Sequence, residues 1–96
     1  ATITNDSLAA GETKSYPVQS NGGRPVLAYV AQTGQSDLVL QILDENGEVM
    51  MDANFGGPNS AEVAFVLPVK TSDYTIEVST ANGETAVYNL VIITLN

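Results

Sequence analysis

Three carboxylates surround one Asn-Gly in the segment DENGE over 44–48, and a fourth, Asp52, follows shortly after. Such a cluster is compatible with a calcium site, with a pair of catalytic acids, or with a solvated turn. Calcium accepts irregular cages of oxygen ligands, so the candidate metal ligands are Asp44, Glu48 and Asp52. We favour the turn, with Asp44 accepting a backbone N–H at its first position and Gly47 in the left-handed position of a bulge.

The remaining reactive side chains argue against an enzyme. Histidine and cysteine are both absent, which removes the usual base for a serine nucleophile, the thiol nucleophiles and most zinc sites. Glycoside hydrolysis needs two acids in a cleft, one of them with a pKa raised by burial. We expect the acids to lie on turns and polar strand faces, where water keeps them ionised. The sequence predicts a non-catalytic protein without a resident cofactor, calcium being the one candidate.

The charge balance restricts the partners. The net charge is −8, and the only cations are Lys14, Arg24 and Lys70. Three scattered cations cannot neutralise a run of phosphates, so we expect neither nucleic-acid binding nor docking on an anionic membrane. No run approaches the roughly 20 apolar residues of a spanning helix. The chain opens on Ala-Thr-Ile-Thr without an initiator methionine, which favours a processed or excised piece of secreted origin.

The elements that must position these residues read as short strands separated by turns. Asn-Gly occurs at 21–22, 46–47 and 82–83, and this dipeptide is the strongest local hairpin signal. Strands are expected on both sides of each copy and once more between the second and the third. The expected ranges are 13–18, 25–33, 38–43, 49–52, 62–67, 74–79 and 86–94.

Hydrophobic periodicity supports this assignment. The segment 74–79 alternates apolar and polar residues, as a half-buried strand does, and Val63, Phe65 and Leu67 are expected to form an inward apolar face. The runs 26–31 and 90–93 are continuously apolar, which is typical of central strands covered on both faces. The sequence therefore predicts an all-β protein: one antiparallel, jelly-roll-like β-sandwich domain of seven or eight short strands spanning 1–96.

Three segments resemble the bacterial pre-peptidase C-terminal domain family. The first reads DLVLQILD over 37–44 and continues to Gly47, where the family carries D-L-x-L-x-[IL]-x-D-x-x-G. The others read DYTIEV over 73–78 and YNLVI over 88–92, where the family carries D-Y-x-[IL]-x-V and Y-x-L-x-[IV]. The resemblance extends over about 13–94 and implies a non-catalytic sandwich attached to secreted peptidases and other extracellular enzymes.

The resemblance also implies possible roles. Modules of this family support secretion, folding or substrate targeting, and the related collagen-binding domains use exposed tyrosines and in some cases calcium. Here Tyr74 and Tyr88 are expected to be buried, and Tyr16 and Tyr29 to be isolated. Periplasmic inhibitors of goose-type lysozyme are similar as well, but their basic stretch before the last strand is replaced by TANGE over 80–84.

One loop is the candidate contact surface. Phe55 lies in the segment NFGGPN over 54–59, and an exposed aromatic on a loop can anchor a partner. Asn54 and Met50 complete the predicted partner-binding set, although for Phe55 we favour the alternative in which it folds back and closes one end of the sandwich. We expect a monomeric binding module for a protein or polymeric extracellular substrate. The alternatives are a periplasmic lysozyme inhibitor and a structural subunit that pairs through edge strands, with residues 2–4 as a donated strand.

Overall fold

Eight β-strands make up the regular structure in the described part of the computed structural model, which comprises residues 2–22, 24–32, 34, 36–54, 61–67 and 71–94. No helix occurs in these ranges, and therefore none that is long and apolar enough to cross a membrane. The strands are β1 (Thr2–Leu8), β2 (Lys14–Ser20), β3 (Val26–Gln32), β4 (Leu38–Leu43), β5 (Val49–Ala53), β6 (Glu62–Val66), β7 (Ser72–Thr80) and β8 (Ala86–Thr94).

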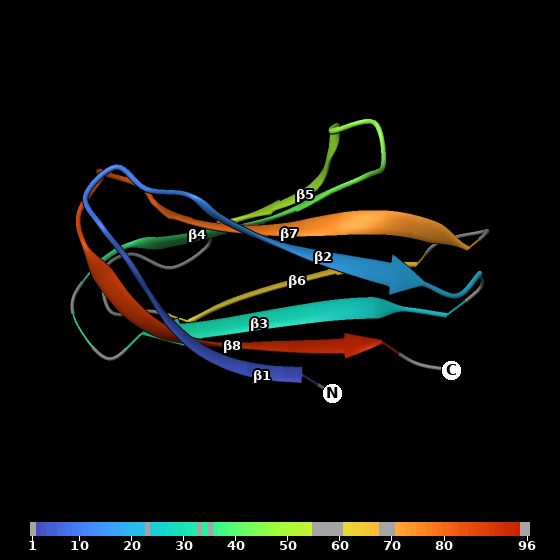
Figure 1. Cartoon of the computed structure of the whole chain (residues 1–96), viewed down its shortest axis with the longest axis horizontal. Coiled ribbons are helices and arrows are strands. Elements are labelled where there is room, and N and C mark those ends of the chain that lie inside the picture. The colour runs from blue at the N-terminus through green and yellow to red at the C-terminus, as the bar shows by residue number, and fades with distance from the viewer. Residues whose placement is uncertain are drawn as a thin grey trace.

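These strands form two antiparallel sheets stacked as a β-sandwich, as predicted. One sheet has the order β1-β8-β3-β6 and the other the order β2-β7-β4-β5. Figure 1 shows the two layers, with β2, β7, β4 and β5 above and β1, β8, β3 and β6 below. Only residues 2–4 of β1 are anticipated from the sequence, whereas the seven other strands lie close to their predicted ranges.

The predicted hairpins are largely wrong. Only Asn46-Gly47 joins two paired strands, β4 and β5. Asn21-Gly22 connects β2 to β3, and Asn82-Gly83 connects β7 to β8, which are strands of different sheets. These two copies turn the chain from one layer to the other, because the local freedom of Asn-Gly permits a reversal of either kind.

The core lies between the inner faces of the two sheets. It contains alternate residues of the strands, and the large, fully buried members include Leu38, Leu40, Ile42, Ile76 and Leu90. Tyr74 and Tyr88 are buried, as predicted, at 8% and 1% exposed. Apolar side chains alternating at period two on stacked sheets produce this arrangement without any disulfide.

The strand β6 alternates between buried and exposed residues, as expected, but the buried face is the one that was predicted to be exposed. Its buried residues are Glu62 and Ala64, whereas Val63 and Phe65 point outward and are 44% and 54% exposed. Leu67, just beyond the strand, is 66% exposed. The prediction of an inward face for these three residues is therefore wrong. A shift of one position inverts a strand, and small Ala64 lies opposite the equally small Ala28 in the tightly packed interior.

Candidate functional site

The predicted DENGE turn is a turn with a bulge, as favoured from the sequence. One carboxylate oxygen of Asp44 accepts hydrogen bonds from the backbone N–H groups of Asn46 and Glu48, each at 2.9 Å. The backbone N–H of Gly47 donates to the carbonyl of Asp44 at 3.0 Å, and Gly47 has a φ of 81°. An L side chain rarely adopts that φ, so glycine suits this position. The carboxylate of Asp44 thus organises its own turn.

The structure does not gather the candidate calcium ligands. Asp52 lies on β5 opposite Gln41, whose amide nitrogen donates to it at 3.2 Å. Asp44 is engaged with its turn, and Glu48 is exposed. Across the described ranges, no three acidic side chains come together in a way that could hold a metal ion. Calcium binding at Asp44, Glu48 and Asp52 thus stays a prediction of the sequence.

The predicted partner-binding residues lie at the two ends of β5. Met50 is 52% exposed, and it is the extra residue of a bulge, since Ile42 pairs with Met51 and Leu43 with Val49. Met51 packs against the core. Asn54 is exposed at the far end of β5, and Phe55 lies outside the described residues. A bulge that turns Val49 and Met50 outward together makes this hairpin a candidate contact surface.

A polar cluster that the sequence analysis missed joins the two sheets. The hydroxyl of Tyr16 on β2 donates to Asp6 on β1 at 2.8 Å, and the Tyr16 and Tyr88 hydroxyls are hydrogen-bonded to each other. The ammonium of Lys14 forms an ion pair with Asp6 at 2.6 Å. Tyr16 is expected from the sequence to be isolated, and its hydrogen bonds to Asp6 and Tyr88 show that this expectation is wrong. The spacing of two residues between Lys14 and Tyr16 places them on the same inward side of β2.

The electrostatics of this cluster suit cohesion and not catalysis. Hydrogen bonds from Lys14, Tyr16 and the Ser7 backbone lower the pKa of Asp6 to about 2. Burial is the main cause that raises the pKa of Tyr16 and of Tyr88 above the ordinary value for tyrosine. The carboxylate is therefore ionised and the phenols are protonated throughout the neutral range. None of these three groups is poised to exchange a proton near pH 7, as a general acid or base must be.

One acid departs from the expectation that all carboxylates lie on turns and polar faces. Glu62 is only 2% exposed, at the start of β6 and opposite Val30. Glu62 is not without an interaction partner. A hollow of about 440 Å³ near the β1 and β8 ends is lined by uncharged residues, Ser7, Leu8, Gly34, Ser36, Thr85, Ala86 and Val87. Glu62 is not among them, so this hollow is no acid-lined cleft.

The acids on the outer face of the β2-β7-β4-β5 sheet, here called the polar face, are hydrogen-bonded by residues of the same face. Its outward side chains include Asp52, Asp73 and Glu77, and each accepts a hydrogen bond from the residue directly opposite. The donors are Gln41, Gln19 and Ser15, at 3.2, 3.4 and 3.2 Å. Cross-strand pairs of this kind stabilise sheets modestly. These carboxylates are spaced along the sheet and do not converge on a common point.

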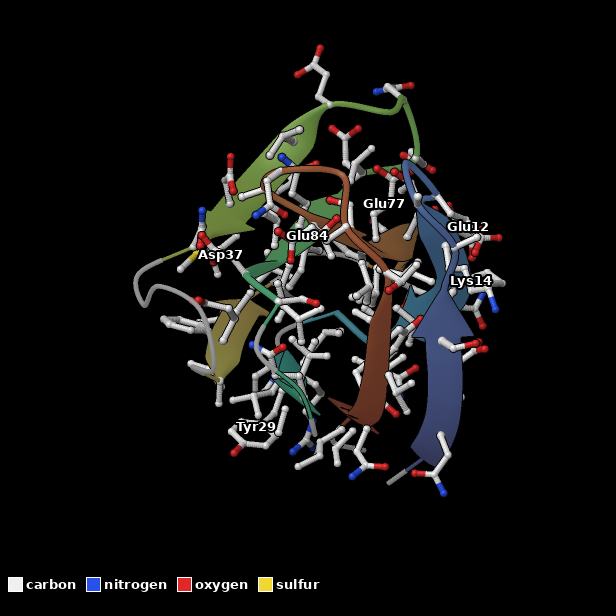
Figure 2. The ribbon with its side chains drawn as sticks, turned by 90° about the vertical axis from the view of Figure 1, so that its left-hand side faces the viewer. Glu12, Lys14, Tyr29, Asp37, Glu77 and Glu84 are labelled. Atoms are coloured by element: carbon white, nitrogen blue, oxygen red, sulfur yellow. The ribbon has the colours of Figure 1, made fainter. Side chains whose placement is uncertain are left out.

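The outer face of the β1-β8-β3-β6 sheet, here called the apolar face, was not predicted. Its side chains pair across the strands, Phe65 with Leu27 and Ile93, and Tyr29 with Val63 and Val91. Figure 2 shows Tyr29 directed away from the sandwich, on the side opposite Glu77. The continuous apolar runs 26–31 and 90–93 predict strands covered on both faces, but in the described part of the chain the outer face of this sheet exposes Tyr29, Val63 and Phe65.

Comparisons with known proteins find similarity in structure and not in sequence. No family model and no curated protein matches this sequence. The pre-peptidase C-terminal domain of a collagenase from Bacillus anthracis has a TM-score of 0.79 and 17% identity, covering 96% of this chain and 88% of that chain. A periplasmic inhibitor of g-type lysozyme from Aeromonas hydrophila gives 0.73 and 14%, covering 95% and 82%. The Yersinia pseudotuberculosis-derived mitogen gives 0.67 and 10%, covering 99% and 86%.

The first of these structures confirms the predicted resemblance to the pre-peptidase C-terminal domain as a likeness of fold. At such identities only the fold is shared with certainty, because one fold carries many functions. The collagenase domain, the lysozyme inhibitor and the mitogen therefore show the fold of this chain and not its role.

Proposed function

We propose that this chain is a non-catalytic accessory module of a secreted or periplasmic bacterial protein, of the pre-peptidase C-terminal type. It binds a protein or polymeric extracellular substrate, or supports the secretion and folding of the protein that carries it. The observation that carries the proposal is the likeness of nearly the whole chain to the collagenase domain. The chemistry of the described residues supports it, since the acids of the polar face are occupied by their neighbours.

The proposed contact surface is the β4–β5 hairpin, with Val49 and Met50 half exposed side by side. Asn54, exposed just beyond the end of β5, extends the proposed surface, and Phe55, the aromatic anchor predicted from the sequence, lies outside the described residues. Methionine adapts its shape to a partner at little cost, which suits a recognition surface. Aromatic anchors add binding energy when they become desolvated.

Co-sedimentation with insoluble polymers tests this function. The purified chain is mixed with peptidoglycan, chitin or fibrillar collagen, and the bound fraction is measured as a function of protein concentration. We expect saturable binding to one of them and a loss of at least about tenfold in affinity for Met50→Thr, the usual effect of removing an interface anchor. Val87→Thr, at an outward position of the opposite sheet with a similar exposure of 58%, is the matched control. Binding that Met50→Thr leaves unchanged, or turnover of any polymer, would contradict the proposal.

Calcium at Asp44, Glu48 and Asp52 is a separate proposal. Titration of calcium chloride into the chelator-treated protein, followed by calorimetry, measures it directly. Asp44→Asn keeps the turn acceptor and removes one charge, so it should weaken a true site strongly, because calcium prefers charged oxygen ligands. A heat no larger than that of dilution would remove calcium from the proposal.

The second candidate function is inhibition of a lysozyme in the periplasm. The similarity to the Aeromonas inhibitor over 95% of the chain supports it. The loop before β8 argues against it, because this loop is acidic here in place of the basic stretch of the inhibitors. Glu84 in this loop accepts a hydrogen bond from the Asn82 side chain at 2.9 Å. A turbidity assay with goose-type lysozyme distinguishes the two functions. Full lysozyme activity at micromolar concentrations of this chain would remove the inhibitor.

The third candidate, assembly through edge strands, has less support. Residues 2–4 already pair with β8 of the same chain, Thr2 with Ile92 and Thr4 with Leu90. Donation of this strand to another molecule would require the chain to give up these pairs. A native β1–β8 ladder that exchanges its amide hydrogens slowly would argue against such donation.

A further inference from the structure

The apolar face has a composition that solvent alone does not explain. Tyr29, Val63 and Phe65 are 42%, 44% and 54% exposed, and Leu27, Val91 and Ile93 lie beside them in register. Within the described ranges, the outward positions of the four strands carry no charged side chain. A continuous apolar surface of this kind on a small protein marks an interaction site.

The charges of the molecule lie elsewhere and would not oppose a second copy on this face. The outward acids Asp52, Asp73 and Glu77 belong to the other sheet. Stacked sheets lie about 10 Å apart, so two copies meeting through their apolar faces would hold their polar faces roughly 30 Å apart. That separation is several times the screening length of about 8 Å at physiological salt. The three outward acids of the polar face therefore add little repulsion between the two copies.

The size of the face matches a reversible dimer. Its strands have 7, 9, 7 and 5 residues, which at about 3.3 Å per residue and 4.8 Å between strands gives roughly 450 Å² of flat area. The molecule measures 37 Å by 20 Å across its longest and shortest axes, which limits a face to about 700 Å². Two faces would bury roughly 900–1,400 Å², around the lower limit of stable interfaces.

We propose that the occupant of the apolar face is the apolar face of a second copy of this chain. A two-fold axis brings the same patch of both molecules together, and a neutral apolar patch is complementary to itself. The two outer sheets pack face to face as sheets do inside a sandwich. Phe65 and Tyr29 provide the aromatic centre of the contact. This goes beyond the proposed function, which holds equally for a monomer, and it replaces the monomer expected from the sequence.

Sedimentation velocity tests the proposal from roughly 1 μM to 1 mM, the span of weak protein associations. We expect the wild type to move from monomer to dimer across this range. Phe65→Glu should weaken the association at least about tenfold, because it places an unpaired charge in the contact. Met50→Glu is the matched control: it has the same charge change and similar exposure at 52%, but it lies on the other sheet and should dimerise like the wild type.

Two further measurements keep the outcome clear. The double variant Tyr29→Thr/Phe65→Thr removes the aromatic groups without adding charge and keeps a residue that favours strands, so it should also be monomeric while the fold is preserved. Raising the salt concentration should leave the association unchanged or stronger, since no charges meet. A wild type that stays monomeric to 1 mM overturns the proposal. So does a Phe65→Glu protein that dimerises normally.

Discussion

The two outer faces of this sandwich differ although both belong to four-stranded antiparallel sheets. The polar face carries three acids, and a neutral side chain on the neighbouring strand hydrogen-bonds each of them. The apolar face carries Tyr29, Phe65 and their aliphatic neighbours, with no charge among its described outward positions. A sheet face built to meet water resembles the first. The second resembles a face built to be covered, and this asymmetry is why we propose that a second copy covers it.

The largest expected effect is on the free energy of unfolding, when a core residue of the sheet that carries the polar face is truncated. An outward residue of the apolar face provides the comparison. Ile76 is fully buried, so Ile76→Ala should reduce the free energy of unfolding by about 2–5 kcal/mol. Phe65→Ala should cost less than about 1 kcal/mol, because Phe65 is 54% exposed. Urea unfolding at low protein concentration, where the dimer is dissociated, measures both.

A large loss of stability in Phe65→Ala would break the comparison. A buried phenylalanine costs about 3–5 kcal/mol when truncated to alanine, which is the result that the sequence-based assignment of β6 predicts. The same experiment therefore decides whether β6 presents Phe65 or Ala64 to the core.

The sequence predicted the sandwich because local patterns determine strands. Seven of the eight strands follow from turn residues and period-two alternation. The first strand, TITNDSL, has few apolar residues and lies at a sheet edge, so its pattern is weak. Two of the three Asn-Gly turns cross between sheets, since the dipeptide sets a reversal of direction and not the partner of the strand that follows.

The candidate surfaces were harder to predict because they depend on register. In β6 both faces contain apolar residues, so the alternation alone cannot say which one is inside. Only the pairing of Ala64 with Ala28 and of Phe65 with Leu27 shows it. Tyr16 and Tyr88 are separated by 72 positions and belong to different sheets, and no local pattern reports their hydrogen bond.

The second prediction has a smaller expected effect and compares two tyrosines in different environments, Tyr16 in the polar cluster and Tyr29 on the apolar face. Tyr16→Phe removes the hydroxyl that bonds Asp6 and Tyr88 and so joins the sheets. We expect a loss of about 1 kcal/mol in the free energy of unfolding, the typical net value of one hydrogen bond. Tyr29→Phe removes an outward hydroxyl of the apolar face and should change stability by less than about 0.5 kcal/mol. Equal effects in thermal unfolding would show that the polar cluster does not hold the two layers together.

The dependence of stability on pH below neutrality tests the role of the polar cluster formed by Asp6, Lys14, Tyr16 and Tyr88. The pKa of Asp6 is lowered from 3.8 to about 2 in the folded protein, so its contribution is present above pH 4 and is lost as the pH falls from about 4 to 2. Asp6→Asn should be less stable than the wild type at neutral pH, and the difference should shrink across this interval. Thermal unfolding midpoints between pH 2 and 7 measure it. A constant difference at every pH would contradict the assigned ion pair and hydrogen bonds.

The smallest effect should come from the polar face itself. Glu77→Gln keeps an oxygen that can accept the hydrogen bond of Ser15 and changes the net charge from −8 to −7. Exposed ion and hydrogen-bond partners contribute little, so the free energy of unfolding should change by less than about 0.5 kcal/mol. The dimerisation constant should also stay within about twofold, because the acids of the two copies lie beyond the screening length. A marked gain in dimerisation by Glu77→Gln would mean that the polar face takes part in the contact, and the distinction between the two faces would fail.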